Sequence, residues 1–239
     1  MANQKAPNMT PGQRVELMVY YAVCCFRLGN VEKGVNTLEQ QFRKTETGLI
    51  YQTLGYLYVE QYDQARNPAL DYAAILAADP GEEEAAGGEA PAEEKAGEEA
   101  GEPEAAAAAE TDGEPEAPPE PTPEEIWNAG RKKAEAFIRK SIEYDDEDSI
   151  CQDNMGQFVY RVLGDKAAAR EWFDRAIALK SSQIDTLWFL SRYDLESGNM
   201  QAALEKLEEA AAGRFSPLNY CQKDQVMAEI ARLKGETQA

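Results

Sequence analysis

One recurring pattern constrains this chain more than any other feature. A small residue is followed four positions later by a bulky apolar residue, and three positions after that by another small residue. Side chains at these spacings share one face of a helix. Small residues let two helices cross closely, and the bulky residue fills the gap between neighbouring helical pairs, so the pattern predicts stacked helical hairpins. It occurs at Ala134, Ile138 and Ser141, at Ala169, Phe173 and Ala176, at Ala203, Leu207 and Ala210, and loosely at Gly34, Leu38 and Gln41.

A second motif supplies the helix that comes before such a pattern. Its residues are Tyr51-x2-Leu54-Gly55-x2-Tyr58. With this spacing the chain resembles the first-helix half of a tetratricopeptide repeat (TPR), with tyrosine at the aromatic start position. The resemblance covers everything except one acidic stretch. It implies an all-α, right-handed solenoid of helical hairpins, with about four repeats and a C-terminal capping helix.

Turn signals divide the chain into these pairs. Glycine followed by Asn or Asp marks the turn inside three of them. Gly156 and Gly164 of the third pair are separated by one residue more than usual, which predicts a bulge or a shifted register there. The expected pairs are residues 12–28 with 31–44, 149–180, and 182–213, followed by a capping helix with Val226, Ile230 and Leu233 on one face.

The second pair has one clear first helix, residues 48–62, and two candidates for its second helix. The candidates are residues 68–78 and residues 123–144, and each begins with a capping residue followed by proline. We favour residues 123–144, because they carry the small-bulky-small pattern and lead directly into the third pair. The earlier helix would then be accessory.

An acidic stretch, residues 81–123, interrupts this second pair. It contains fourteen Glu, one Asp and one Lys, and it carries −14 of the chain's net charge of −20. Nothing larger than Ala, Pro or Thr is available there to bury, so folding could not offset a backbone entropy cost of about 1–2 kcal/mol per residue. We expect a disordered insert that separates N-terminal repeats, residues 1–80, from C-terminal repeats, residues 124–239.

Composition excludes several classes of function. The chain has no histidine, which removes His-dependent catalysis, His-bearing zinc sites and His-ligated haem. The four cysteines form no CxxC pair and are expected to be reduced packing residues. The acidic run at residues 145–148 lacks the spacing and the glycine of a calcium-binding loop. We therefore predict no catalytic residues, no cofactor and no metal site, and expect a protein that is not an enzyme.

Charge and hydropathy limit the partners. The negative charge disfavours nucleic acid, because no run rich in Lys and Arg offsets it. No apolar run approaches the ~20 residues of a membrane-spanning helix, and residues 1–13 lack the hydrophobic core of a signal peptide. We expect a cytoplasmic protein whose partner is a protein or peptide.

The TPR resemblance implies where that partner would bind. In the family, the first helices line a concave groove that holds partner peptides. Tyr56, Tyr160, Trp188 and Arg192 are the expected anchors, because aromatic residues and Arg carry much of the energy of interfaces. The alternative is that some of these side chains only pack between adjacent helices. The groove-facing positions would be Val19, Val23, Arg27, Gln52, Tyr56, Val59, Asp153, Gln157, Tyr160, Trp188, Arg192 and Leu195.

Two other functions stay open. The acidic stretch could itself act, as an acidic chaperone or a nucleic-acid mimic that binds basic proteins through residues 81–123. Such binding would weaken steeply with added salt. The chain could also be a regulatory subunit of a larger complex. We favour a non-catalytic interaction scaffold whose binding survives removal of the acidic stretch.

Overall fold

The computed structural model describes residues 9–63, 65 and 121–237, and no strand occurs among them. Their regular structure is entirely helical. The helices are α1 (Pro11–Arg27), α2 (Val31–Phe42), α3 (Gly48–Tyr62), α5 (Pro123–Tyr144), α6 (Ser149–Gln157), which continues into the π-helix η1 (Phe158–Val162), α7 (Lys166–Leu179), α8 (Ile184–Glu196), α9 (Met200–Ala212) and α10 (Lys223–Thr237).

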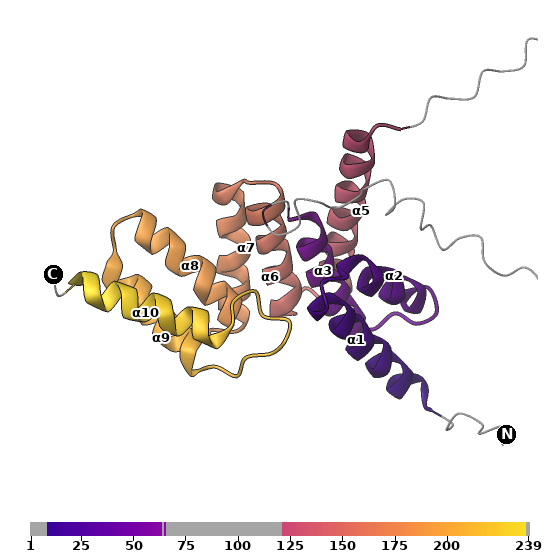
Figure 1. Cartoon of the computed structure of the whole chain (residues 1–239), viewed down its shortest axis with the longest axis horizontal. Coiled ribbons are helices and arrows are strands. Elements are labelled where there is room, and N and C mark those ends of the chain that lie inside the picture. The colour runs from indigo at the N-terminus through magenta and orange to yellow at the C-terminus, as the bar shows by residue number, and fades with distance from the viewer. Residues whose placement is uncertain (1–8, 64, 66–120, 238–239) are drawn as a thin grey trace, which may run out of the picture.

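The helices pair in chain order. α1 packs on α2, α3 on α5, α6 with η1 on α7, and α8 on α9, while α10 covers α9. Each pair also contacts the next, so the pairs stack into an array with α1 and α2 near one end and α8, α9 and α10 at the other (Figure 1). The predicted all-α, TPR-like architecture of stacked hairpins with a capping helix is confirmed.

α5 takes the position of the second helix in the second pair, as the sequence analysis favoured, because it packs against both α3 and α6. A capping box fixes its start: the Thr122 hydroxyl accepts from the N–H of Glu125, and the Glu125 carboxylate accepts from the N–H of Thr122. Thr122 therefore belongs to the helical array and not to the acidic stretch. Residues 68–78, the other candidate, and residues 81–120 lie outside the described part of the chain.

Three of the four pairs turn from first to second helix in the same way. A glycine with positive φ ends the first helix, and the Asn or Asp that follows caps the second helix through its side-chain oxygen. This reversal allows the second helix to return along the first. The pairs of residues are Gly29 (φ 81°) with Asn30, Gly164 (φ 73°) with Asp165, and Gly198 (φ 78°) with Asn199.

The small-bulky-small pattern forms the close crossings for which it was predicted. Leu38, Ile138, Phe173 and Leu207 are all 0% exposed. A Cβ atom added to Gly34 would lie 2.8 Å from a backbone carbonyl oxygen of α1, and one added to Gly156 would lie 2.7 Å from the Phe173 ring. Small residues are therefore needed where these helices meet, as the sequence indicated.

The extra residue of the third pair is accommodated by η1. The N–H of Leu163 donates to the carbonyl of Phe158, five residues earlier, at 3.1 Å. A π-helical turn is the usual way in which an α-helix absorbs one inserted residue. The predicted bulge is thus confirmed, and it brings Arg161, at the end of η1, into the interior of the array.

Candidate partner-binding surface

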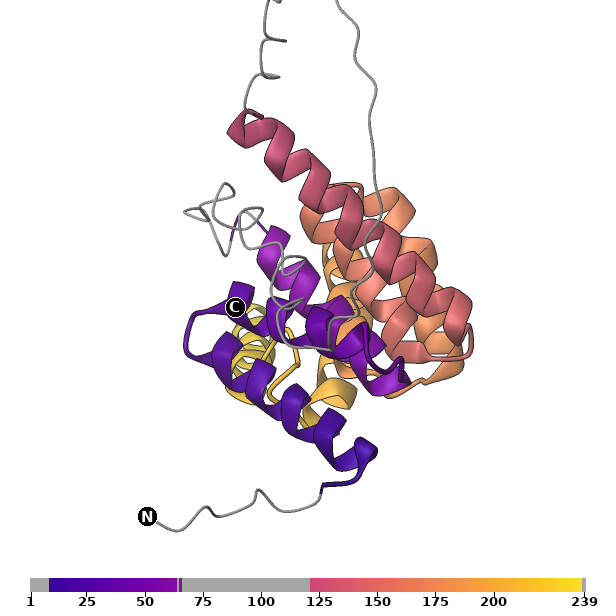
Figure 2. The same ribbon diagram turned by 90° about the vertical axis from the view of Figure 1, so that its right-hand side faces the viewer.

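A long connection, residues 213–222, joins α9 to α10, and we call it the groove loop. Apart from the segment between α3 and α5, the other connections between helices have three to five residues. Helices that pack side by side need only about 2–8 connecting residues, so the groove loop is longer than its joining role requires. It runs from α9 toward α1 along the side formed by the first helices of the pairs (Figures 1 and 2).

The middle of the groove loop is a tight turn held by its own atoms. The N–H of Ser216 donates to Oδ1 of Asn219 at 2.7 Å, and the N–H of Asn219 donates to the carbonyl of Ser216 at 3.1 Å. The N–H of Leu218 donates to the hydroxyl of Ser216 at 3.2 Å. Pro217 suits the second position of such a turn because its ring fixes φ. The turn therefore forms from local contacts alone.

The groove loop contacts first helices at both ends of the array. The Arg27 guanidinium of α1 donates to the carbonyl of Pro217. At the other end, the carboxylate of Asp185, in the first turn of α8, accepts from Nδ2 of Asn219 at 3.1 Å and from the N–H of Tyr220 at 3.0 Å. The loop thus spans the face predicted to be the groove, from the first pair to the fourth.

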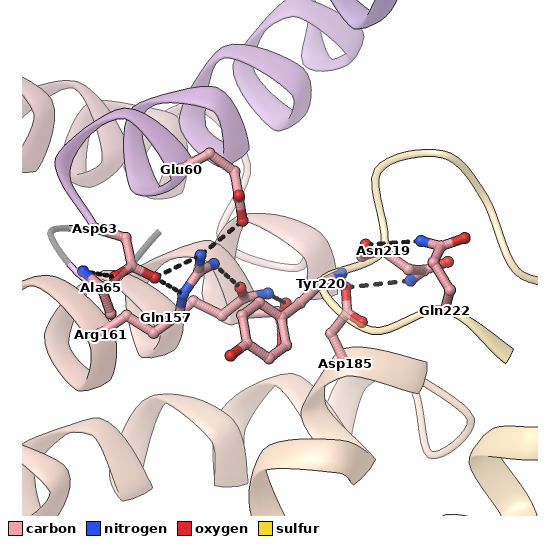
Figure 3. A network of polar contacts seen from close by, with 10 residues as sticks. Glu60, Asp63, Ala65, Gln157, Arg161, Asp185, Asn219, Tyr220 and Gln222 are labelled. Carbon is pink, nitrogen blue, oxygen red and sulfur yellow. Dashed lines mark hydrogen bonds and ion pairs between the residues drawn. The ribbon is translucent and has the colours of Figure 1, made fainter. Parts of the chain in front are cut away.

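Arg161 lies at the centre of the surface under the groove loop (Figure 3). Its guanidinium donates to the carboxylates of Glu60 at 2.7 Å and Asp63 at 2.9 Å, and to Oε1 of Gln157 at 2.8 Å. The Tyr220 ring stacks on it, with its centroid 4.3 Å from the guanidinium carbon. Because only 3% of the Arg161 side chain is exposed, this residue holds α3, η1 and the groove loop together without competition from water.

The same network continues to the fourth pair. Nε2 of Gln157 donates to Oδ2 of Asp153 at 2.7 Å, and the hydroxyl of Thr186 in α8 donates to Oδ1 of Asp153 at 2.6 Å. Asp153, Gln157 and Arg161 are spaced four residues apart, so they follow one face of α6 and η1. A continuous chain of buried polar contacts therefore links α3, α6, η1 and α8, and it fixes their relative positions.

Negative charge exceeds positive charge in this interior. Glu60, Asp63, Asp153 and Asp185 are each no more than 4% exposed. Burial, helped by the negative charge of Asp185, raises the pKa of the Asp153 carboxyl above its ordinary range. Burial also raises the pKa of Asp185, although its hydrogen bonds from the groove loop act in the opposite direction. Protonation is therefore easier at these two carboxyls than at an exposed aspartate.

A cavity of about 130 Å³ separates the groove loop from α3, α6 and α8. Its walls are mixed, with amide, hydroxyl and carboxyl groups beside apolar side chains. The groove loop therefore fills this part of the surface incompletely. The lining residues that matter here are Tyr56 of α3, Asp153 and Asn154 of α6, Asp185 of α8, and Leu218 and Asn219 of the groove loop.

The structure places the predicted groove residues at different depths. Arg27 is exposed, and Val23, Gln52, Tyr160, Trp188, Arg192 and Leu195 are half-buried. Val59 and Gln157 are fully buried, and Val19, Tyr56 and Asp153 nearly so, which means that packed helices or the groove loop cover them. The groove loop brings three of these residues together: it contacts Arg27, and it lines one cavity with Tyr56 and Asp153. Contact of any of these residues with a partner stays a prediction.

All four expected anchors have packing partners within the chain, and the Tyr56 ring lies 5.8 Å from that of Phe26 of α1. The Tyr160 ring lies 5.1 Å from that of Phe189, between η1 and α8. The guanidinium of Arg192 stacks over Trp188 at 4.2 Å and pairs with Glu229 of α10 at 2.6 Å. α10 therefore covers the α8 end of the predicted groove.

Sequence reasoning missed the residues that organise this surface, Arg161, Asp185 and Tyr220. Arg161 was missed because its position depends on the π-helical turn, which shifts the register of everything after Gly156. For Tyr220 a signal was present. Ser216-Pro217 marks a turn, and two large side chains follow it in a connection too long for its endpoints.

The cysteines differ from their prediction at one position. Cys25, Cys151 and Cys221 are buried, as expected of packing residues, but Cys24 is exposed. Burial raises the pKa of the Cys151 thiol to about 12 and that of Cys221 further still, which disfavours a reactive thiolate at either.

No group of three or more potential metal ligands occurs in the described ranges. None of the helices that the structure describes has the length and apolar character to span a membrane.

Comparisons with known proteins give a limited result. No protein-family model matches the sequence, and no curated protein matches it. Among solved structures, TTC0263, a thermophilic TPR protein of Thermus thermophilus, aligns with 92% of this chain and 98% of its own, at 12% sequence identity and a TM-score of 0.40. The hairpin architecture therefore rests on the helix pairing, the turns and the close crossings within this chain.

Proposed function

We propose that this chain is a non-catalytic adaptor that holds a segment of a partner protein on the side formed by α1, α3, α6 and α8. The observation that carries the proposal is the groove loop. A short stretch of polypeptide already lies across this side, bound by guanidinium and carboxylate groups of several helices and by the Phe189 ring of α8. A surface that binds one such segment has the chemistry to bind another.

A pair of matched variants of α1 tests this function. Arg27 contacts the groove loop, and Val23 lies four residues earlier on the same helical face. The inner variant is Val23→Ser with Arg27→Glu. The outer control is Arg14→Glu with Tyr20→Ser, at two exposed positions of the same helix. The measurement is quantitative affinity purification from the native cell, followed by calorimetry with each purified candidate.

The expected result is at least one protein that binds the wild type and the outer control but not the inner variant. If every bound protein is retained by the inner variant, the proposal is wrong. A protein that the inner variant retains, but that is lost when residues 81–120 are deleted, would instead support the acidic-chaperone alternative.

A further inference from the structure

We propose that the groove loop is an exchangeable occupant of this surface, and that the partner segment displaces it by presenting the same chemistry. That chemistry is a proline turn, an aliphatic side chain at the position of Leu218, and an aromatic side chain two residues later at the position of Tyr220. The inference rests on the proposed function and names the class of partner segment.

The first reason is that the bound motif is locally self-sufficient. All three hydrogen bonds that shape the turn join atoms of residues 216–219 to one another. A segment of another protein with the order Ser-Pro-Leu-Asn-Tyr can therefore form the same turn before it binds. Preorganisation of this kind lowers the entropy that binding must overcome.

The second reason is that side chains of the helical array make the contacts that hold the loop in place. Asp185 accepts one backbone N–H and one amide from the loop, Arg27 donates to one carbonyl, and Arg161 lies against the Tyr220 ring. Each contact can be made equally well by a segment from outside the chain. Leu218 and Tyr220 are only half-buried, and the cavity beside Leu218 and Asn219 shows that the loop does not fill its site.

The third reason is that the loop can leave while the helices stay. α10 is held on the fourth pair by its own apolar face, with Val226, Ile230 and Leu233 packed in a cluster that includes Leu207 of α9. Residues 216–220 belong to no helix. Local opening of such a segment requires far less free energy than global unfolding.

Tethering sets the size of the expected effect. A segment joined to its site through a short linker competes at an effective concentration on the order of 1 mM. A free peptide of the same sequence therefore binds the wild type more weakly than it binds a chain whose loop has been removed. The difference should be at least about tenfold.

The experiment replaces residues 216–220 by Gly-Ser-Gly-Ser-Gly in the full chain and retains Phe215 and Cys221, which pack in the cluster formed by α8, α9 and α10. Fluorescence anisotropy then measures binding of a labelled Phe-Ser-Pro-Leu-Asn-Tyr-Ser peptide. The control peptide has Ala in place of Tyr. We expect the loop-replaced chain to bind the parent peptide at least tenfold more tightly than the wild type does, and at least tenfold more tightly than it binds the control.

A folded loop-replaced chain that binds neither peptide, or both equally, would overturn the inference. If circular dichroism shows that this chain does not fold, hydrogen exchange of the wild type decides. Exchange at the Tyr220 amide that is at least tenfold faster than at Ile230 and Leu233 supports an opening loop, whereas equal rates reject it. If the peptide binds as expected but affinity purification finds no protein that the inner variant loses, only the adaptor role is rejected. The inference about the groove loop then stands.

Discussion

Replacement of Arg161 by methionine should destabilise this protein more than the loss of almost any other charge. Methionine keeps much of the aliphatic bulk but removes the guanidinium that pairs with the buried carboxylates of Glu60 and Asp63. Removal of one partner from a buried ion pair costs about 3–5 kcal/mol. For a protein of this size, each kcal/mol lowers Tm by about 2–4 °C, so Tm should fall by about 6–20 °C.

Urea unfolding followed by circular dichroism measures the effect, with thermal melting as a second measurement. The control is Arg139→Met on α5, because Arg139 pairs with Glu135 on the same helix and its side chain is 54% exposed. An exposed pair of this kind contributes only about 0.3–0.5 kcal/mol. A triple variant that adds Glu60→Gln and Asp63→Asn should regain most of the stability, because it also removes the two buried negative charges that Arg161 offsets.

Two results would refute this account of Arg161. In the first, Arg161→Met lowers the free energy of unfolding by less than about 1 kcal/mol, within the range of an ordinary surface pair. In the second, the triple variant is no more stable than the single one. The loss would then come from packing around η1 and not from the loss of the ion pairs with Glu60 and Asp63.

Other perturbations test the close crossings, the buried carboxyls and the acidic stretch. Gly34→Ala should cost about 1–3 kcal/mol in urea unfolding, because the added Cβ meets a backbone carbonyl of α1 at 2.8 Å, whereas Gly48→Ala, where nothing lies within 4 Å, should change stability by less than about 1 kcal/mol. The raised pKa values of Asp153 and Asp185 mean that the folded state binds more protons than the unfolded state does. The contribution of these two carboxyls to the free energy of unfolding is therefore present near pH 4 and is lost as the pH rises toward neutrality. Urea unfolding from pH 4 to 7 should show this slope, and Asp153→Asn with Asp185→Asn should flatten it. Deletion of residues 81–120 behind a short Gly/Ser linker should leave Tm nearly unchanged, because each doubling of loop length costs only about 0.6 kcal/mol.

The architecture was predictable because its signals are local and recur. Gly34, Ala169 and Ala203 each mark a close crossing, and a glycine followed by Asn or Asp marks each of three turns. Even the extra residue between Gly156 and Gly164 could be read as a bulge, since it broke an otherwise regular spacing. Such features depend on neighbours three to eight residues away, which a single sequence displays directly.

The surface was less predictable because it depends on contacts between residues far apart. The family pattern placed Tyr56 and Val59 on an open groove, but it carries no information about a connection that folds back over them. Arg161 meets Glu60 across the insert, and Asp185 meets Tyr220 across the whole of α9. No periodicity links these positions. The sequence held only an indirect indication of these contacts. The connection between α9 and α10, residues 213–222, is longer than is needed to join the two helices.

The groove loop also changes how such an array should respond to a partner. In a solenoid each hairpin contacts its neighbours, so its ends are coupled only through the stack between them. Here Arg27 of the first pair reaches Pro217, 190 residues later in the chain, and thereby joins the two ends directly. A partner segment that takes the place of the groove loop breaks this direct link within the chain. It can nevertheless restore the hydrogen bonds to Arg27 and Asp185 and the stacking on Arg161. Displacement should therefore leave the hairpins packed as they are, while it frees the connection before α10.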